Sequence, residues 1–336
     1  MGFVPFYYLL RATCYVLLIY IRFYIQMIFI FSGVIPYLES RGRVVEEQKN
    51  YFLVDTNQGI IRCVLKGTLK KVRARICAGD LVQITVTNND SLDGIITNVE
   101  ERTSYIRRPA LANLTQIVLV ATLKSPHLDL ESIDRMLFSA EAYGIKPLLV
   151  FNKVDLLSDS ESKELDAIIS LYQRCGYSSL KTSAETGIGI ERLKEFCERE
   201  ISAFSGLSGV GKSTLLSKIF PDIHFRIGEV SGIRGRGTHT TTNIIIHRYK
   251  EDSYIADTPG LSFIDIPEIS EESTGAYFPE IAACIGMCRF NNCIHDNEPG
   301  CEVLQRINSG QIAASRRDHY LKIYSEMKVI RKQYRK

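Results

Sequence analysis

The distribution of apolar and polar residues divides the chain into four regions. Residues 1–38 form aromatic and aliphatic runs that Arg11 and Arg22 interrupt, and they are interpreted as a hydrophobic N-terminal extension. Residues 39–110 contain short β-rich runs spaced by Gly, Asn and Asp, which predict a five-stranded, OB-like β-barrel. The runs cover residues 44–45, 51–54, 60–65, 81–86 and 94–99.

Residues 111–275 have the alternating pattern of a doubly wound α/β sheet. Two apolar runs predict buried parallel strands, and two amphipathic segments predict helices beside them. The strands are expected at 116–123 and 147–151, and the helices at 129–143 and 160–176. Residues 276–336 are predicted to form a cysteine-bearing, helical C-terminal domain. The fold class is therefore multidomain α/β.

Composition narrows the class of protein only slightly. A chain of 336 residues with 45% apolar and 24% charged residues is typical of a soluble globular protein of two or three domains. The formal net charge of +3 is too small to indicate a polyanionic partner, so the positions of the charges must decide. The isolated cysteines are typical of reduced core thiols in a cytoplasmic protein, and nothing demands more than a monomer. They are Cys14, Cys63, Cys77, Cys175 and Cys197.

The first 38 residues leave three interpretations open. No single run reaches the roughly 18–20 apolar residues of a membrane span. The first interpretation is a signal anchor or a membrane-surface helix, because the whole stretch is long enough to cross a bilayer if Arg22 extends its charge to the interface. A cleaved secretory signal is disfavoured, because no small-residue cleavage pattern follows a short apolar core. The third interpretation is an N-terminal extension, translated from upstream of the natural start, with no part in the chemistry. The rest of the chain is typical of a cytoplasmic protein.

The strongest chemical signal is a glycine-rich phosphate loop between a predicted strand at 201–205 and a predicted helix. It matches the pattern G-x-x-x-x-G-K-[ST], in which successive backbone N–H groups cradle nucleotide phosphates. Lys212 is expected to reach the β- and γ-phosphates, and the Ser213 hydroxyl to bind Mg²⁺. The residues of this loop are Gly206, Leu207, Ser208, Gly209, Val210, Gly211, Lys212, Ser213 and Thr214.

A second loop contains the residues expected to recognise guanine. Asn152, Lys153, Val154 and Asp155 follow the predicted strand at 147–151. The Asp155 carboxylate can accept hydrogen bonds from N1–H and the 2-amino group of guanine, and adenine offers neither. After the next predicted strand, Ser183 and Ala184 resemble the small-residue loop whose N–H groups contact the guanine oxygen in GTPases.

The remaining elements of a GTPase follow the phosphate loop. The segment at 235–242 carries threonines, of which Thr240 or Thr241 would complete the Mg²⁺ shell. Asp257 would hold the metal through water, and the Gly260 N–H would sense the γ-phosphate. The guanine-reading elements therefore precede the phosphate loop, in rotated order. A parallel sheet tolerates this order because its strands keep their places whichever connection is cut.

The water-orienting group is not obvious. Where many GTPases carry a Gln after the Asp-x-x-Gly element, this chain has Leu261, which cannot orient water. His239 is a hypothesis for this role, because an imidazole can position water or accept a proton near neutral pH. The alternative is that His239 packs or contacts RNA and that a partner stimulates hydrolysis.

A cysteine-rich segment follows the GTPase elements. Cys288, Cys293, His295 and Cys301 offer three thiolates and one imidazole, which is the ligand set of a closed structural zinc site. Cys284 is a rival ligand, but we expect it to be a buried thiol on the preceding helix. The alternative to zinc is a disulfide pair, which the cytoplasm disfavours.

Basic residues flank the predicted sheet on both sides, which favours an RNA-binding frame over two solvated faces. One group lies in and after the barrel, and the other lies in a predicted terminal helix at 310–336 that also carries Tyr320, Tyr324 and Tyr334. The barrel group is Lys66, Lys70, Lys71, Arg73, Arg75, Arg102, Arg107 and Arg108. The helix group is Arg316, Arg317, Lys322, Lys328, Arg331, Lys332, Arg335 and Lys336.

From about residue 42 to residue 331, the chain resembles the circularly permuted, small-ribosomal-subunit-dependent GTPases of the RsgA or YjeQ family. The resemblance rests on the rotated order, the phosphate loop, the threonine segment, residues 257–260 and the zinc pattern. It implies GTP hydrolysis stimulated by the small ribosomal subunit, rRNA binding, and a late role in maturation of that subunit. The alternatives are an ATP-using kinase or ATPase, a non-catalytic GTP-dependent RNA-binding assembly factor, and a membrane-tethered GTPase.

Overall fold

A computed structural model describes residues 38–67, 69, 76–88, 92–225, 244–258 and 264–334. Several predictions fall outside these residues and stay predictions. They concern the N-terminal extension, the basic residues at 70–75, the segment with His239, Thr240 and Thr241, and the loop with Gly260 and Leu261. In the described part of the chain, no helix is long and apolar enough to span a bilayer.

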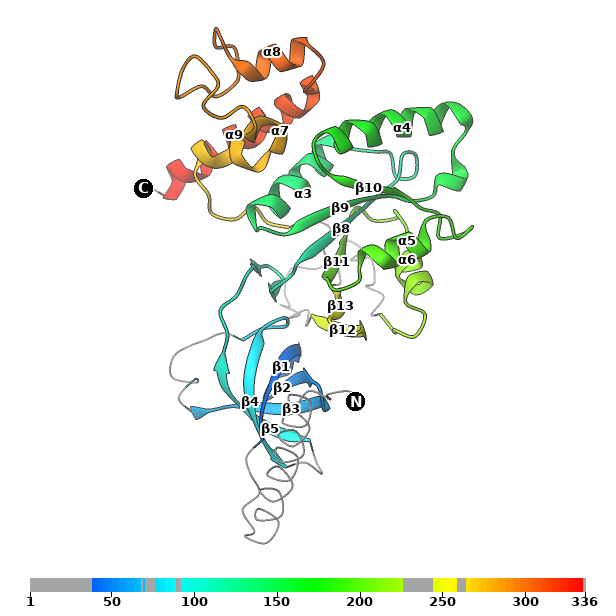
Figure 1. Ribbon diagram of the computed structural model, residues 1–336, viewed down its shortest axis with the longest axis vertical. Helices are drawn as coiled ribbons and strands as arrows, with labels where there is room; N and C mark the ends of the chain where they lie inside the picture. The colour runs from blue at the N-terminus through cyan, green and yellow to red at the C-terminus, as the bar shows by residue number, and fades with distance from the viewer. Residues whose placement is uncertain are drawn as a thin grey trace, which may run out of the picture.

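Five strands close an N-terminal barrel, as the sequence predicts (Figure 1). Strand β1 pairs antiparallel with both β2 and β4, β3 pairs parallel with β5, and β4 pairs with β5, so each strand has two neighbours in the barrel. The first strand is longer than its apolar run because it must pair with two partners along its length. The strands are β1 (Leu38–Glu47), β2 (Phe52–Thr56), β3 (Gly59–Leu65), β4 (Leu81–Asn88) and β5 (Asp93–Val99).

A hairpin connects the barrel to a second sheet of order β10-β9-β8-β11-β13-β12. All neighbours in this sheet are parallel except β12 and β13, which are antiparallel. The hairpin strands are β6 (Tyr105–Arg107) and β7 (Ala110–Ala112). The sheet strands are β8 (Gln116–Ala121), β9 (Lys146–Phe151), β10 (Ser178–Lys181), β11 (Ile201–Ser205), β12 (Ile245–Lys250) and β13 (Ser253–Asp257).

Helices cover both faces of the second sheet, which confirms the doubly wound pattern (Figure 1). Along β8, Ile117 and Leu119 pack into the core under α3 and α4, whereas Val118 and Val120 pack into the core under α5 and α6. This two-sided burial is why the strand is apolar at every position after Gln116 instead of alternating. The helices are α3 (Leu130–Ala142), α4 (Asp159–Arg174), α5 (Ile190–Phe196) and α6 (Lys212–Ile219).

A helical C-terminal module, defined as residues 271–334, packs beside α3 (Figure 1). Its core contains Phe278, Ile281 and Ile323, together with Phe138 from α3. The long terminal helix begins at Ala314, four residues after the predicted start, because a separate short helix precedes it. The elements are the 3₁₀ helix η2 (Glu271–Tyr277), α7 (Pro279–Ala282), α8 (Glu302–Asn308) and α9 (Ala314–Tyr334).

Candidate nucleotide site and metal centre

The sheet topology places the predicted nucleotide loops at one edge. Strands β8, β9, β10, β11 and β13 run parallel, so their carboxyl ends meet on the same side, where open α/β sheets bind ligands. The guanine loop (residues 152–155) follows β9, and Ser183 and Ala184 follow β10. The phosphate loop (residues 206–211) follows β11, and Asp257 ends β13. The structure therefore brings together elements that are far apart in the chain.

Two glycines of the phosphate loop are required by close backbone contacts. Gly206 has φ 143°, and a Cβ there would lie 2.1 Å from the Val120 carbonyl oxygen of β8. Gly211 has φ 91°, and a Cβ there would lie 2.5 Å from Nδ2 of Asn152. A side chain at either position would push the loop away from its neighbours. The glycine spacing thus holds the phosphate loop against both β8 and the guanine loop.

Lys212 begins α6 and folds back over the phosphate loop. Its Nζ donates hydrogen bonds to the carbonyl oxygens of Gly206 at 2.6 Å and Leu207 at 2.9 Å. Burial lowers the pKa of Lys212, a cost that the negative charge of nucleotide phosphates would offset. Ser213 and Thr214 lie exposed in the first helical turn, where a hydroxyl and the backbone N–H groups can face phosphate or Mg²⁺.

Asn152 ties the guanine loop to the phosphate loop. Its side chain is 3% exposed and donates from Nδ2 to the Val210 carbonyl oxygen at 2.9 Å. Its Oδ1 accepts a hydrogen bond of 3.2 Å from the Thr182 hydroxyl, which leads into the Ser183–Ala184 loop. One buried amide therefore joins three nucleotide-site loops.

Lys153 makes a second bridge from a left-handed backbone conformation with φ 62°. Its Nζ donates to the carbonyl oxygens of Gly209 at 2.7 Å and Ser125 at 2.9 Å. Sequence reasoning missed Ser125, because a backbone carbonyl contributes through its position and carries no side-chain signal. The lysine stem is thereby fixed, and its charge is satisfied by the loops that it joins.

Asp155 and the small-residue loop complete the base-reading side. Asp155 is exposed in the 3₁₀ helix η1 (Val154–Leu156), whose Val154 N–H donates to the Thr182 carbonyl oxygen at 3.2 Å. Ser183 is fully buried, and its hydroxyl accepts a hydrogen bond of 3.1 Å from the Thr186 N–H. Asp155 is exposed to water, so its carboxylate would become buried only when a base binds. Bound adenine would leave this buried carboxylate without hydrogen-bond donors, and that loss would weaken its binding.

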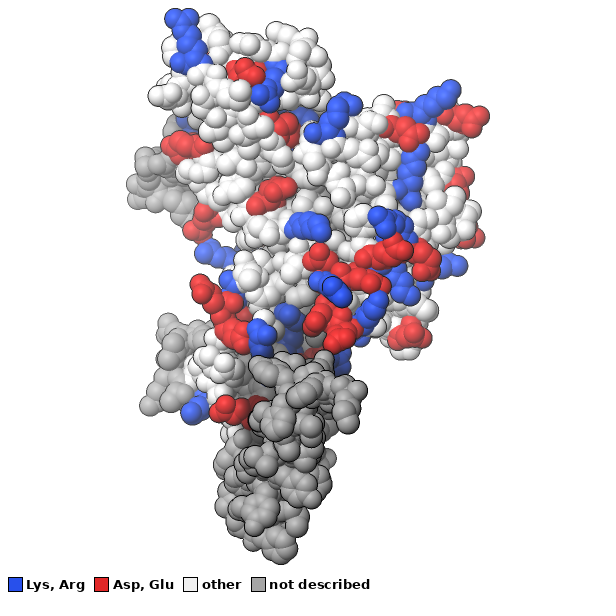
Figure 2. All heavy atoms as spheres, in the orientation of Figure 1, with Lys and Arg blue, Asp and Glu red and all other residues white. Residues whose placement is uncertain are grey.

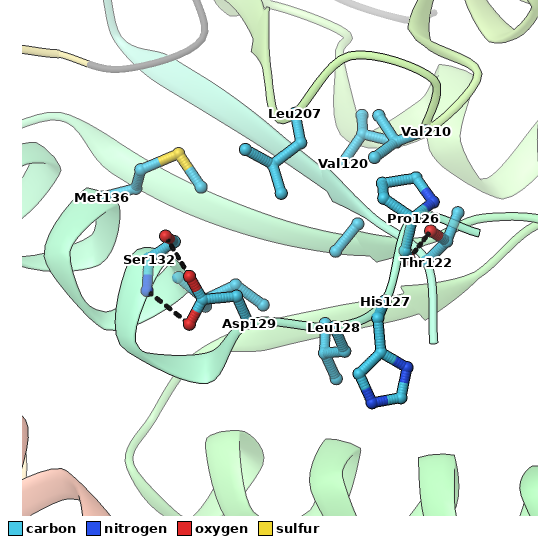
Figure 3. A pocket seen from close by; sticks show the side chains of 12 residues that line it. Val120, Thr122, Pro126, His127, Leu128, Asp129, Ser132, Met136, Leu207 and Val210 are labelled. Carbon is cyan, nitrogen blue, oxygen red and sulfur yellow. Dashed lines mark hydrogen bonds between the residues drawn. The ribbon is translucent and has the colours of Figure 1, made fainter. Parts of the chain in front are cut away.

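A small, mainly apolar pocket supports the phosphate loop from the side of α3 (Figure 3). Leu207 and Val210 line one side, and Met136 of α3 lines another. The connecting loop is held closed by the Thr122 hydroxyl, which donates to the Pro126 carbonyl oxygen at 2.7 Å. The side chains that line this pocket pack behind the phosphate loop and support it.

The four predicted zinc ligands converge, and their candidate ligand atoms lie within 4.8 Å of one another. Nδ1 of His295 lies 3.6 Å from the Cys288 sulfur, 3.5 Å from that of Cys293 and 3.4 Å from that of Cys301. A tetrahedral zinc ion with ordinary bond lengths separates N and S ligands by about 3.6 Å. Cys284 lies outside the group, with its buried thiol donating to the Glu280 carbonyl oxygen at 3.4 Å.

The surroundings of this group suit a cation. Burial raises the pKa of Cys293 to about 12 and lowers the pKa of His295. The lowered pKa of His295 favours the neutral imidazole, which is its metal-binding form, and the Cys293 thiol needs a cation to become a thiolate. The Glu302 N–H donates to the Cys288 sulfur at 3.4 Å, the type of contact that orients a ligand from outside the metal shell. The residues present fit zinc.

Several basic residues that were expected to face RNA are instead used inside the protein. Arg316 is 1% exposed and Tyr320 is 3% exposed, so the prediction that they are available to RNA is wrong. Arg102 pairs with the fully buried Asp80 at 2.7 Å, whereas Arg317 pairs with the exposed Asp318 at 3.3 Å. Figure 2 shows basic and acidic side chains interspersed over the visible face of the molecule, without one dominant sign.

The fold and the site together define a P-loop GTPase in which the guanine-reading loops precede the phosphate loop in the chain. A family model described as RsgA GTPase matches residues 99–267, and one described as the RsgA N-terminal domain matches residues 41–96. The chain belongs to the RsgA GTPase family. It is a GTP-hydrolysing enzyme that uses GTP with Mg²⁺, and its Cys₃His group can hold one structural zinc ion.

Curated relatives and solved structures agree with this assignment. The small ribosomal subunit biogenesis GTPase RsgA of Moorella thermoacetica is 37% identical over 286 residues, covering 85% of this chain and 97% of its own. The Thermotoga petrophila protein of the same name is 37% identical over 293 residues, covering 86% and 97%. YjeQ from Thermotoga maritima superposes with a TM-score of 0.76 at 34% identity, covering 86% and 99%. YloQ, a circularly permuted GTPase, gives 0.73 at 27% identity, covering 87% and 96%.

Proposed function

We propose that this GTPase is stimulated by the small ribosomal subunit and acts in late maturation of that subunit by binding its rRNA. The main structural support for guanine-nucleotide binding is the pair of hydrogen bonds that Asn152 and Lys153 of the guanine loop donate to the phosphate loop. These hydrogen bonds fix the guanine loop and the phosphate loop relative to each other. The names of the relatives support the ribosomal partner.

The RNA contacts in this proposal come from basic residues that remain exposed. On the barrel these include Lys49, Arg62 and Lys66, and the Arg62 guanidinium lies 4.5 Å from the ring centroid of Tyr51. Lys328 is exposed on α9. Cationic groups beside an aromatic ring suit both phosphate pairing and base stacking.

The proposed switch uses residues that flank the described strands. Thr240 or Thr241 and the Gly260 amide would hold Mg²⁺ and the γ-phosphate when GTP is bound, and hydrolysis would release them. Lys212 neutralises phosphate charge, and His239 is the hypothesis for the water-orienting group. A monomeric, cytoplasmic protein fits this role, with residues 1–38 as a separate extension.

The test is phosphate release from GTP by the full chain, with and without purified small ribosomal subunits. ATP serves as the nucleotide control and large subunits as the particle control. We expect slow turnover of GTP alone, a sharp rise with small subunits, and no rise with large subunits. GTP turnover that is indifferent to the small subunit would overturn the assigned partner and leave the nucleotide chemistry in place.

Guanine recognition has a separate test in Asp155→Asn. The amide loses one acceptor for the guanine N1–H and 2-amino pair, but its NH₂ can donate to the 2-oxo group of xanthine. We expect the KM for GTP to rise at least about a hundredfold and xanthosine triphosphate to become the better substrate. Unchanged preference for GTP over xanthosine triphosphate would show that Asp155 does not read the base.

A further inference from the structure

Strand β12 lies between the nucleotide site and the barrel. On one side it pairs with β13, where Ile245 stands opposite Asp257. On the other side it pairs with barrel strand β1, where the same Ile245 stands opposite Glu46. Ile245 therefore lies between Asp257, the carboxylate expected on the Mg²⁺ side of the site, and Glu46 of the barrel. The two sheets are continuous through this point.

A buried polar cluster strengthens the same junction. Asp55 of β2 is 5% exposed and accepts a hydrogen bond of 3.0 Å from the hydroxyl of Tyr254, which precedes Asp257 on β13. Nε of Arg248 on β12 lies 3.3 Å from the same carboxylate, and the Arg43 guanidinium lies 5.1 Å from the centroid of the Tyr254 ring. The barrel therefore holds both strands that lead to the Mg²⁺ side of the site.

The geometry of β1 shows how the barrel reaches this position. Its register with β2 shifts between Val44 and Glu46, an irregularity of the kind that bends a strand and re-aims its edge. Beyond the shift, Glu46 pairs with Leu53 on one side and Ile245 on the other. Because this pairing and the buried hydrogen bond from Tyr254 to Asp55 join the two sheets, movement of β12 or β13 must either carry the barrel with it or break buried contacts.

We propose that this seam, defined as Arg43, Glu46 and Asp55 of the barrel with Ile245, Arg248 and Tyr254 of the sheet, couples nucleotide state to the barrel. Asp55 and Tyr254 join the barrel to β13, and RNA bound on the barrel acts back on this strand through the same contacts. This extension to RNA rests on the proposed function. Coupling of binding at two sites is reciprocal, so nucleotide and RNA must each change the affinity of the other by the same factor.

The first test needs no ribosome. Amide hydrogen exchange of the full chain is compared between GDP and a non-hydrolysable GTP analogue, both with Mg²⁺. We expect the protection of β1 around Val45–Glu47 to differ at least about fivefold between the two nucleotides. Tyr254→Phe should remove that difference, because it removes the hydroxyl that joins Asp55 to β13. Equal protection of β1 with both nucleotides in the unmodified protein would overturn the coupling.

The second test uses turnover with small subunits. Asp55→Ala and Tyr254→Phe should keep basal GTP turnover within about twofold and reduce the subunit-stimulated rate at least about fivefold. Asp55→Asn keeps an acceptor for the Tyr254 hydroxyl and should restore most of the stimulation. The matched control is Glu198→Ala, which removes an exposed 2.7 Å ion pair to Lys250 at the other end of β12 without touching the barrel.

The outcomes separate the two proposals. Full stimulation in Asp55→Ala and Tyr254→Phe would overturn the seam and leave the ribosomal partner intact. An equal loss of basal and stimulated turnover would also overturn it, because it would show a structural defect only. Absence of stimulation in the unmodified protein would defeat the proposed function, whereas the exchange experiment would still decide whether nucleotide state reaches the barrel.

Discussion

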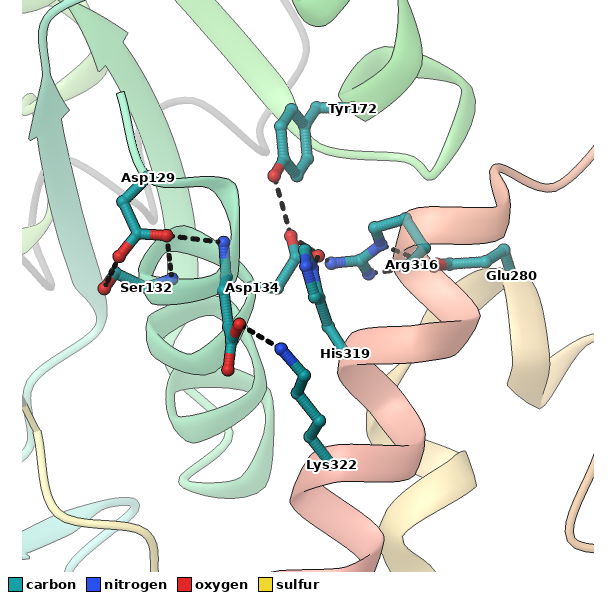
Figure 4. Close-up of polar contacts among 9 residues, drawn as sticks. Asp129, Ser132, Asp134, Tyr172, Glu280, Arg316, His319 and Lys322 are labelled. Atoms are coloured by element: carbon teal, nitrogen blue, oxygen red, sulfur yellow. Dashed lines mark hydrogen bonds and ion pairs between the residues drawn. The ribbon is translucent and has the colours of Figure 1, made fainter. Parts of the chain in front are cut away.

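The barrel and the C-terminal module are joined to the GTPase sheet by different physical means. The barrel is joined by the backbone pairing of Glu46 with Ile245 and by a small polar cluster, next to the strands that lead to Asp257. The C-terminal module is joined by side chains, through a buried ion cluster on α3 (Figure 4). Backbone pairing between strands transmits strand movement, whereas a buried charge cluster demands one orientation. We therefore expect the barrel to follow strand movement, which we call the mobile coupling, and the C-terminal module to keep one orientation, which we call the fixed mount.

The ion cluster is centred on Arg316 of α9. Its guanidinium lies 2.7 Å from Asp134 of α3 and 2.6 Å from Glu280 of α7. Burial works against the charge, but the two carboxylates together raise the pKa of Arg316. Asp134 also accepts a hydrogen bond of 2.7 Å from the Tyr172 hydroxyl and lies 2.6 Å from His319 Nδ1. Each charge in the cluster therefore has buried partners.

The largest expected effect is loss of the metal. In Cys288→Ser, or after treatment with a strong chelator, the C-terminal module should lose zinc and its ordered fold, because structural zinc binding is worth about 10 kcal/mol or more. Zinc content by elemental analysis and limited proteolysis of residues 271–334 measure this loss. The matched control is Cys284→Ser, a buried thiol outside the ligand group, which should retain zinc. Zinc retained in Cys288→Ser would refute the ligand set.

The next effect concerns the fixed mount. Arg316→Met leaves Asp134 and Glu280 buried without their cation, which should lower the free energy of unfolding by about 3–5 kcal/mol. Denaturant unfolding monitored by hydrogen exchange of α3 and α9 measures this change. A loss below about 1 kcal/mol would mean that the carboxylates find other partners and that the cluster does not fix the module.

A smaller effect is expected at the seam. Tyr254→Phe removes one hydrogen bond to a buried carboxylate, while Arg248 remains beside it. The free energy of unfolding should fall by about 1.5 kcal/mol, the lower end for hydrogen bonds to charged groups. Thermal unfolding of the full chain at several denaturant concentrations would measure it. A loss as large as that of Arg316→Met would contradict the distinction between a mobile coupling and a fixed mount.

The smallest effect is expected for a second ion pair between α3 and α9. Arg135 and Glu326 lie 2.6 Å apart, but their side chains are 41% and 45% exposed. Water and salt screen this pair, so Arg135→Ala should cost less than about 1 kcal/mol. The same unfolding assay applies, with raised salt as a check. A cost equal to that of Arg316→Met would show that burial does not set the energetics of this interface.

Much of the fold and the chemistry was predictable because it depends on local patterns. The two-sided apolar runs of β8 and β9, the glycines of the phosphate loop and the cysteine spacing each constrain a short stretch of chain. Arg316 could not be read in the same way. It lies among basic residues in the sequence, and its partners Asp134 and Glu280 come from distant elements. Residue type alone does not distinguish an arginine that faces solvent from one that a carboxylate pair holds in the core.

By itself, the sequence determined the chemical inventory of this protein: a loop that binds phosphates, a loop that reads guanine, and a set of sulfur and nitrogen ligands. These motifs work through residue types and spacings that are short compared with the chain, so local backbone preferences reveal them. Only the tertiary structure decided that Asn152 and Lys153 bind the phosphate loop, that Arg316 is buried, and that Ile245 lies between Asp257 and Glu46. Those relations depend on which distant strands and helices pack together, and that outcome belongs to the whole core.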